Sequence, residues 1–490
     1  MHQQRLAIFF SLCLPILLLG CDSVPDEHYE LPRMYNGEHL TLLHAKTILT
    51  MDESMPSAHA VMMLGDRIVG VGEAEDLRLK FAGANIVENH QLQNKVIVPG
   101  FISQHIHPVL AALTLSMEIL SIEDWVLPEG KVLAVRGRDD YLARLSAAEA
   151  QMQDPQEPLL TWGFHHYFHG VLTRQDLDGL STTRPILVWH RSAHEFILNS
   201  AALNTLEIDE AFISSFKPEV QAQTNLAEGH FWEQGMFAVQ PKLRDMLASP
   251  KRLYRGLQFV ERYLHSNGIT LASEPGGLQS KMLLLAQMVV LGDSDTPFRT
   301  YFIADGKSLL KSSTKETLMD NTAAIRSWSW QRTQFLPNQV KLFADGAIFS
   351  QTMQMLDPYL DGHSGEWITQ PQDFKEAFQQ YWEAGYQIHV HQNGDAGLEL
   401  LLDTLSENLQ RFPREDHRTV IVHFGFATAS QVKRIAELGA LVSANPYYPV
   451  ALADRYSQFG LGPERANQMV RLGDVARENI SFSLQNRQFS

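Results

Sequence analysis

The sequence predicts a TIM-like (β/α)8 barrel that follows a small β domain. From residue 95 onward, short apolar runs rich in β-branched residues alternate with helical patterns, as in repeated β–α units. Amphipathic periodicity is clearest at 251–265, 372–384 and 429–438. The eight runs expected to form the barrel strands are 96–103, 269–273, 299–304, 340–344, 387–391, 420–424, 441–445 and 480–484.

The β domain is expected at residues 40–95, and the barrel occupies 96–490. Gly65-Asp66 separates apolar runs at 60–64 and 67–71, which predicts a hairpin, and residues 47–50 form another strand. We interpret the domain as a fragment of a β-sandwich. An insertion at about 108–267 interrupts the barrel and contains two further strand-like runs, at 159–164 and 186–190.

Residues 1–21 read as a targeting segment. Arg5 precedes an apolar stretch that is too short for a membrane span, and the stretch ends in Leu18-Leu19-Gly20-Cys21. This ending resembles a bacterial lipobox, in which the chain is cut before the cysteine and its thiol carries the lipid. Asp22 resembles the signal for retention at the inner membrane, and 22–39 is a tether. We expect a lipid-anchored protein on the periplasmic side of the cell envelope; an uncleaved anchor is the alternative.

Composition narrows the choice of partners and metal ligands. The formal net charge is −16 and no basic run occurs, which argues against a nucleic-acid partner. The two cysteines are Cys13 and Cys21, so the folded body has neither a disulfide nor a thiolate metal site. Any metal must therefore be held by histidine, carboxylate or a modified lysine.

Polar residues stand where several predicted barrel strands end. His105 and His107 follow the first strand and point to the same side of an extended chain. Lys341 interrupts the apolar fourth strand, His391 ends the fifth and His423 ends the sixth. Each alone could be a satisfied core group, but together they predict a metal site, because imidazole is a common ligand of divalent metals. His389 lies on the same face as His391 and is an alternative to it.

The pattern resembles the amidohydrolase superfamily, and the sequence motifs are closest to those of amidohydrolase family 3, the branch containing N-substituted formamide deformylase. The resemblance covers about residues 41–484. It rests on these pieces of sequence: Pro99-Gly100-Phe101 through His105-Ile106-His107-Pro108, Val340 to Gly346, Asp357-Pro358-Tyr359, His391-Gln392-Asn393-Gly394-Asp395, and His194 followed by Asn199-Ser200.

The resemblance implies a metal-dependent hydrolase acting on non-peptide C–N bonds of small N-acyl or N-formyl amides. His105 and His107 would hold one divalent ion, zinc by default, and His391 and His423 a second. Lys341, carboxylated by carbon dioxide, would bridge them; burial favours the neutral amine that this reaction requires. Hydroxide bound to the metal would attack the carbonyl carbon.

The insertion is expected to supply substrate contacts, with simple packing as the alternative reading. Aromatic side chains there suit an apolar amide without selecting one. The candidate residues are Trp162, His165, His166, His190, His194 and Trp232.

One implied residue has no match. The superfamily's general acid and base is an aspartate at the end of strand eight, whereas this chain continues Gln485-Asn486-Arg487 after its last strand. We expect a C-terminally truncated chain that lacks part of the sandwich, with low stability and little activity. Asp345, Asp395 and His389 are the substitute proton carriers to consider. The alternatives are an inactive metal- or ligand-binding lipoprotein, or an esterase or phosphotriesterase-like hydrolase on the same scaffold.

The lipobox yields the first testable prediction. Replacing Cys21 by Ser should abolish acylation and leave an uncleaved precursor, because the thiol is the attachment point. Labelling with a fatty-acid analogue and membrane fractionation measure this. Processing and membrane attachment as in the unsubstituted chain would show the lipobox interpretation to be wrong.

Overall fold

The computed structural model describes residues 39–277 and 281–485. The expected signal peptide, Cys21 and Asp22 lie outside these residues. The chain separates into two compact units, of which one extends to Phe101 and the other begins at Ile102. None of the described helices is both long enough and apolar enough to cross a membrane.

The first unit is built on one five-stranded sheet with the order β3-β2-β1-β4, in which β5 also pairs with β1. Helix α2 packs on one face, where its Leu77 meets Leu40, Leu42 and Met62. The predicted hairpin is confirmed, since β2 and β3 pair on either side of Gly65. The second sheet that the sandwich interpretation requires does not occur among the described residues of this unit. The elements are β1 (Leu40–Leu49), β2 (Ser57–Leu64), β3 (Arg67–Gly72), α2 (Ala74–Lys80), β4 (Ile86–Asn89) and β5 (Val96–Ile97).

The prediction of one strand over 96–103 was wrong. Val96 and Ile97 pair with β1 of the first unit, whereas β6 (Phe101–Ser103) belongs to the barrel sheet. Pro99-Gly100 separates the two strands, because proline has no N–H to donate to a ladder. The boundary between the units accordingly lies at Phe101, not at residue 95.

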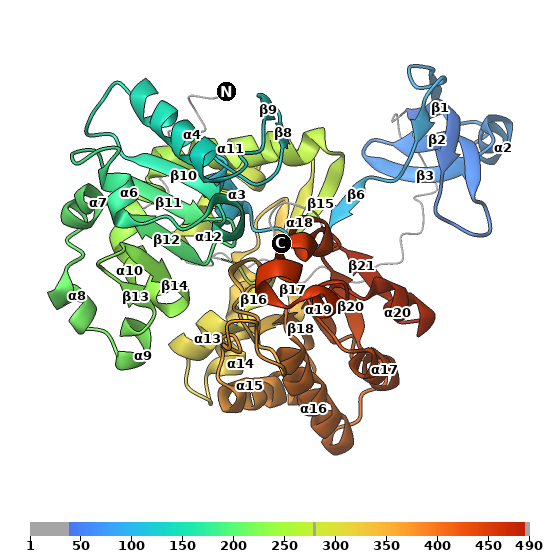
Figure 1. Ribbon diagram of the computed structural model, residues 1–490. Coiled ribbons are helices and arrows are strands. Elements are labelled where there is room, and N and C mark those ends of the chain that lie inside the picture. Colours follow the sequence, from blue (N-terminus) through green and yellow to red (C-terminus); the bar gives the residue numbers. More distant parts are fainter. Residues whose placement is uncertain (1–38, 278–280, 486–490) are drawn as a thin grey trace. The chain divides into compact units, whose positions relative to one another are not determined.

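The second unit contains an eight-stranded sheet in which the strands follow one another in chain order (Figure 1). The ladders from β15 to β21 are all parallel, as expected for β–α units. The curled sheet is that of a TIM-like barrel; β6 and β21 are its two edges among the described residues. Its strands after β6 are β15 (Ile269–Pro275), β16 (Arg299–Asp305), β17 (Thr333–Phe343), β18 (Gln387–Gln392), β19 (Val420–His423), β20 (Leu441–Ala444) and β21 (Phe482–Leu484).

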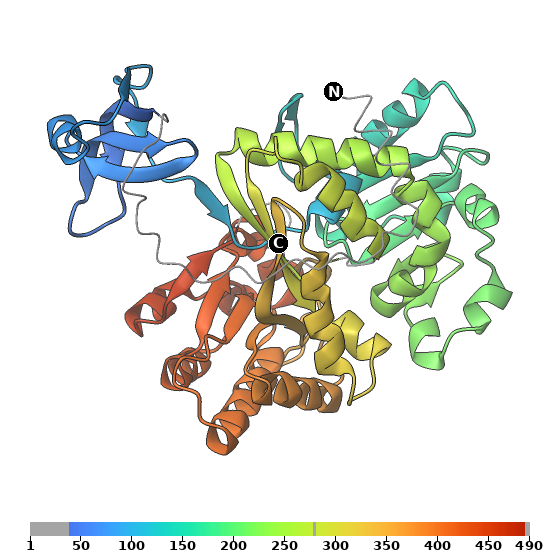
Figure 2. The ribbon, with the colours of Figure 1, turned by 180° about the vertical axis from the view of Figure 1, so that it is seen from behind.

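Helices cover the outer face of this sheet (Figure 2). The three helical patterns read from the sequence correspond to α11, α15 and α17. Apolar side chains of the strands, such as Val340, Ile388 and Ile421, share one buried cluster with Phe378 and Leu401 of the helices. The helices are α3 (Pro108–Thr114), α11 (Pro250–Ser266), α12 (Lys281–Leu291), α13 (Gly306–Ser312), α14 (Leu318–Ala324), α15 (Pro371–Glu383), α16 (Asp395–Arg411), α17 (Ala429–Leu438), α18 (Tyr447–Arg455), α19 (Pro463–Ala466) and α20 (Leu472–Arg477).

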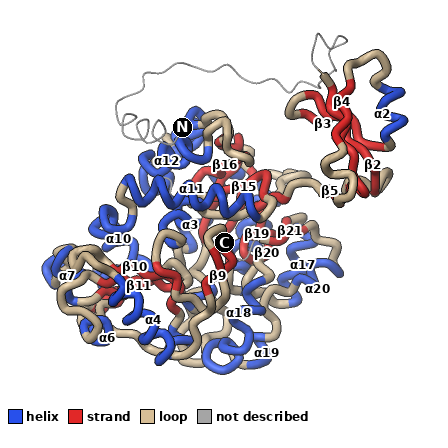
Figure 3. Tube along the Cα trace, turned by 90° about the horizontal axis from the view of Figure 1, so that it is seen from above, coloured by secondary structure: helices blue, strands red, loops and turns tan. Residues whose placement is uncertain are grey.

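The insertion forms its own six-stranded sheet, β13-β14-β12-β11-β10-β7, which Figure 3 shows apart from β19 to β21. Both strand-like runs predicted inside the insertion are confirmed as β10 and β11. The elements that matter for the site are β7 (Glu118–Ile119), α4 (Arg138–Gln151), β10 (Leu159–Phe164), α5 (His166–His169), β11 (Ile186–His190), β12 (Glu195–Leu198), β13 (Thr224–Asn225), β14 (His230–Trp232) and α10 (Glu233–Leu247).

Candidate metal centre

The loop after β6 brings the first two histidines together. Ile106 donates its N–H to the carbonyl of Ser273, which fastens this loop to β15. The Nε2 atoms of His105 and His107 stand 3.2 Å apart, and the Nδ1 of His107 donates to Glu274 at 3.1 Å. A neutral His107 that donates through Nδ1 carries its lone pair on Nε2. Two nitrogens bound to one tetrahedral zinc ion stand about 3.4 Å apart, so this pair fits a shared ion.

Lys341 lies on β17, and its side chain is only 1% exposed. In the ladders it stands between Asp305 of β16 and His389 of β18. Its amine has no hydrogen-bond partner in the described part of the protein. Burial holds the pKa of Lys341 well below its usual value, and the charge of Asp305 offsets this only in part.

Glycine at position 276 makes room for that lysine. A Cβ on Gly276 would lie 2.7 Å from the Cβ of Lys341, and the backbone there has a φ of +68°. Gly277 is equally confined, since a Cβ would stand 2.8 Å from the Nδ1 of His107. Larger residues at the end of β15 would therefore displace both Lys341 and His107.

His423 reaches the site through an unusual backbone conformation. In the ladder it pairs with Gln392, one position out of step with His391, so regular alternation would send its ring away from that of His391. Its φ is +78°, in the left-handed region that non-glycine residues seldom adopt. The ring centroid of His423 instead lies 4.6 Å from that of His391 and 4.6 Å from that of His105. Strain of this kind is typical of functional sites.

Amide side chains contact the rings of His391 and His423 and orient them. The Nδ1 of His423 donates to the Oε1 of Gln485 at 3.1 Å, which leaves its Nε2 for the site. The amide of Asn393 lies 3.0 Å from the Nε2 of His391. Gln485 directly follows β21, so an amide, not a carboxylate, occupies this position at the end of the eighth strand.

The electrostatics of the site keep its imidazoles neutral. Burial lowers the pKa of His105, His391 and His423 well below the usual value. A neutral imidazole has a lone pair for a cation. Three neutral histidines, together with His107 and the buried amine of Lys341, therefore form a donor set that can hold one or two divalent ions.

Other histidine groups among the described residues are more compact than the group of four barrel histidines. Among the described residues, two sets have ligand atoms all within 4.8 Å of one another: His165, His166 and His190, and His44, Glu88 and His90. The barrel histidines form no such set, because they are spread around Lys341. A site for two ions that share a lysine-derived ligand has this extended form.

The proposed substitute proton carriers are engaged in structural contacts. Asp345 accepts backbone N–H groups from Asn393, Gly394 and Gln354, and burial raises its pKa to about 7. Asp395 accepts the N–H of Leu356.

The two histidines of β18 have different contacts. The Nε2 of His389 lies 3.1 Å from the Oε1 of Gln339, and burial lowers its pKa to about 3. Its neighbour His391 is the one that contacts His423.

The candidate substrate-binding residues divide into two groups. Trp162 is buried under the guanidinium of Arg191, 4.9 Å from its ring, which fits the packing alternative. His166 and Trp232 instead line a cavity of about 510 Å³, a size suited to a small molecule. The other polar residues lining the cavity are Glu195, His230, Glu233, Ser350, Gln351, Thr352, Asp361, His363 and Glu366.

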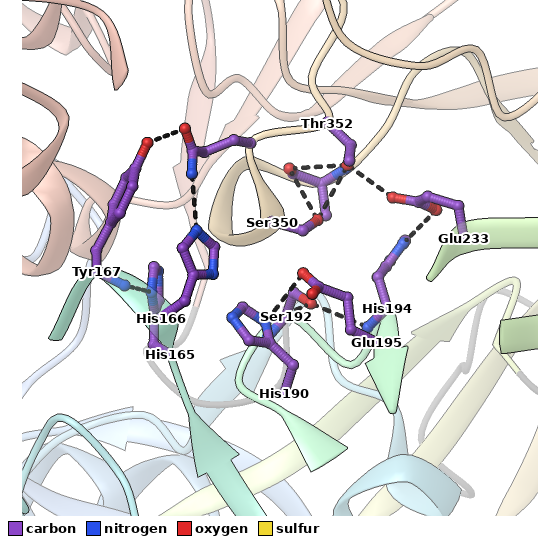
Figure 4. Close-up of polar contacts among 12 residues, drawn as sticks. His165, His166, Tyr167, His190, Ser192, His194, Glu195, Glu233, Ser350 and Thr352 are labelled. Carbon is purple, nitrogen blue, oxygen red and sulfur yellow. Dashed lines mark hydrogen bonds and ion pairs between the residues drawn. The ribbon is translucent and has the colours of Figure 1, made fainter. Parts of the chain in front are cut away.

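A hydrogen-bonded chain joins Thr352 and Glu233 of the cavity wall to His194 (Figure 4). Thr352 donates to Glu233 at 2.6 Å, and the Nδ1 of His194 donates to the other oxygen of Glu233 at 2.8 Å. Burial lowers the pKa of His391, and a positive charge on His194 would lower it further. The sequence had indicated His194, whereas Glu233, Glu274, Asp305 and Gln485 were missed. Glu274 and Asp305 could have been found, since each is a polar residue at the end of a predicted strand.

Comparisons with known proteins agree with this geometry. The family model described as the amidohydrolase family matches residues 91–486. The chain is 24% identical to the exoenzymes regulatory protein AepA of Pectobacterium carotovorum subsp. carotovorum, over 90% of this chain and 93% of that protein. It is 21% identical to the N-substituted formamide deformylase of Arthrobacter pascens, over 81% of this chain and 71% of that protein. A crystal structure of an uncharacterized metal-dependent hydrolase from Pyrococcus horikoshii shares the fold, with a TM-score of 0.65, 17% identity and coverage of 92% and 83% of the two chains.

Metal content tests the assignment of the two histidines on β18. Replacing His391 by Ala should lower the metal bound per chain, because its ring adjoins that of His423. Replacing His389 by Ala should leave the content unchanged, because its Nε2 is bonded to Gln339. Elemental analysis after dialysis measures both variants; metal loss in the His389 variant alone would reverse the assignment.

The first pair of histidines and Glu274 are tested in the same way. Joint replacement of His105 and His107 by Ala should remove most of the metal, and full content in that variant would exclude the site. Glu274→Gln should weaken metal affinity about 10- to 100-fold, since partners that orient a ligating histidine typically contribute that much.

Proposed function

The chain belongs to the amidohydrolase family, and from that premise we propose that it hydrolyses the C–N bond of a small non-peptide amide. Membership and the fold shared with metal-dependent hydrolases support a metal-dependent hydrolase. The similarity to an N-substituted formamide deformylase supports N-acyl or N-formyl amides as the substrate class. The observation that carries the proposal is the set of neutral histidines around the unpartnered amine of Lys341.

The metal would be held by five residues at the ends of four strands. His105 and His107 supply one pair of nitrogens, and His391 and His423 supply the other. Lys341, once carboxylated by carbon dioxide, adds an anionic oxygen ligand between the pairs; its depressed pKa provides the neutral amine that this reaction needs. Zinc suits nitrogen and oxygen ligands of this kind. When bound, the ion polarises a carbonyl group and lowers the pKa of water.

The remaining residues orient the ligands and carry protons. Glu274 fixes the ring of His107, and Gln485 fixes that of His423. We assign proton transfer to His194, because Glu233 holds its Nδ1 at 2.8 Å and leaves its Nε2 for the substrate. The cavity beside it, with Trp232 in its wall, would receive the rest of the substrate.

The location of the reaction follows from the N-terminal sequence. We propose that Cys21 carries a lipid that anchors the protein to the membrane, with the hydrolase on the periplasmic side. A small amide that enters the cell envelope is then the substrate available to it.

A substrate panel tests the proposed reaction. The zinc-loaded protein should release amines from N-formyl and N-acyl amines faster than it cleaves the matching esters or phosphotriesters. His194→Asn should lower kcat about 10²- to 10⁴-fold with unchanged metal content, because general acid–base groups contribute that much. His265→Asn serves as the control, since this exposed histidine in the last turn of α11 does not line the cavity and leaves His194 untouched.

Two outcomes would contradict the proposal. Turnover of esters alone would assign a different hydrolysis to the same scaffold. Full metal binding without turnover of any substrate would indicate an inactive metal-binding protein, the alternative that the amide of Gln485 favours.

A further inference from the structure

Three histidines of the insertion form a second cluster. His165 and His166 lie where β10 leads into α5, and His190 ends β11 (Figure 4). The ring centroid of His190 lies 4.9 Å from that of His165 and 5.5 Å from that of His166. His165 and His190 are almost fully buried, at 0% and 1% exposure. The cluster resembles a metal site in its spacing, but its hydrogen bonds indicate a different ligand.

The backbone determines which ring nitrogens carry the protons. The N–H of Tyr167 donates to the Nδ1 of His165 at 3.2 Å, and the N–H of Ser192 donates to the Nδ1 of His190 at 3.1 Å. The Ser192 hydroxyl, 2.9 Å from the same Nδ1, can rotate to donate to it as well. Burial lowers the pKa of both histidines well below the usual value, so the rings are neutral. A neutral ring that accepts at Nδ1 must carry its proton on Nε2.

Those two Nε2–H groups have no acceptor. Both are buried, and neither has a hydrogen-bond partner in the described part of the protein. The Nη2 of Arg191 is a third buried donor of this kind, and the charge of Arg191 acts on His165. Buried polar groups are normally paired, so unpaired donors in one place indicate a missing acceptor.

The third histidine, His166, also accepts a hydrogen bond at one ring nitrogen. The amide of Gln351 donates to its Nε2 at 2.9 Å, while the Oε1 of Gln351 accepts the hydroxyl of Tyr167. The proton of a neutral His166 is therefore on Nδ1. A cation would need lone pairs at this cluster, but the protein already engages a lone pair on each of the three rings.

We propose that His165 and His190, assisted by Arg191, bind a carboxylate group of the substrate through their Nε2–H and Nη2–H donors. Two N–H donors beside a guanidinium suit the two oxygens of a carboxylate. His166 connects this subsite with the cavity, because it both lines the cavity and lies 5.1 Å from the ring of His165. The inference rests on the proposed function in one respect only, namely that the bound carboxylate belongs to the amide that is hydrolysed.

Acidic residues of the cavity do not oppose an anion there. Glu195 is paired with His230 at 2.9 Å, Glu233 with His194 at 2.8 Å, and Asp361 with His363. Burial raises the pKa of Glu366, the remaining carboxyl group in the cavity wall. Glu195 also lies 3.6 Å from His190, but at Nδ1 and not at the proposed donor Nε2. Arg191 is paired with Glu123 at 2.8 Å through its Nε, so its Nη2 is the group that remains for a ligand. The charge of Arg455 also lowers the pKa of His165.

Calorimetry with a matched pair of probes tests the subsite. The zinc-loaded protein should bind phenylacetate at least 10-fold more tightly than phenylacetamide, its neutral counterpart. His165→Phe and His190→Phe should each weaken phenylacetate binding about 10-fold, because each removes one donor and keeps the ring. His190→Asn, which retains an N–H donor, should recover part of the affinity. His265→Phe, at an exposed position on α11 that does not line the cavity, should bind as the unsubstituted protein does.

Four results would overturn the proposal. Equal binding of the two probes would exclude a carboxylate subsite. Unchanged phenylacetate binding in both phenylalanine variants would assign it to the barrel metals. Loss of metal per chain in either variant would make the cluster a metal site. If the phenylalanine variants do not fold, a second probe pair replaces them. Equal affinity of the intact protein for N-acetylphenylalanine and N-acetylphenethylamine would then exclude a carboxylate subsite.

Failure of the proposed hydrolysis can be told apart from failure of the subsite. The His194→Asn variant lacks the assigned proton carrier but keeps all three donors of the subsite. It should bind phenylacetate normally while it turns over poorly. A protein that hydrolyses amides but does not discriminate between the two probes refutes only the subsite.

Discussion

The amine of Lys341, which is buried and has no hydrogen-bond partner among residues 39–277 and 281–485, is the constraint on which the rest of the site depends. An isolated ammonium in that position is costly, so the protein favours the neutral form, and the pKa is depressed accordingly. The same burial keeps the surrounding histidines neutral and ready to donate lone pairs. Gly276 is part of this arrangement, because any side chain there would displace the lysine. An unpartnered amine among neutral imidazoles is stabilised by carboxylation and metal binding, which is why we assign the site to that chemistry.

The barrel topology explains how residues far apart in the sequence reach one place. Parallel strands in chain order carry their C-terminal ends to the same side, and each contributes one or two side chains there. Partners from neighbouring strands then orient the ligands: Glu274 on β15 holds His107, and Gln485 after β21 holds His423. The insertion adds His194 with Glu233 and the second histidine cluster, so the proposed metal ligands and the proposed substrate contacts lie on different sheets.

Much of this could be predicted from the sequence, since local patterns carry it. The eight strand regions, the hairpin at Gly65 and the histidines His105 and His107 were all visible as short-range signals. What could not be predicted depends on contacts over long distances or on one backbone angle. The hydrogen bond between His107 and Glu274 joins residues 167 positions apart, and the positive φ of His423 has no trace in its sequence neighbours. Pro99 was a signal that residues 96–103 divide between two sheets, but the apolar run favoured the prediction of a single strand. Closure of the barrel and the sandwich interpretation stay predictions.

The central claim is that Lys341 is neutral and serves the metals as a carboxylated ligand. The most direct measurement is carbon-13 NMR of the zinc-loaded protein prepared with labelled bicarbonate, beside the Lys341→Met variant, which keeps an apolar chain of similar length. Our account predicts about one carbamate signal per chain, absent from the variant and lost when the metal is removed. Stoichiometric metal in the unsubstituted protein without any such signal would contradict it.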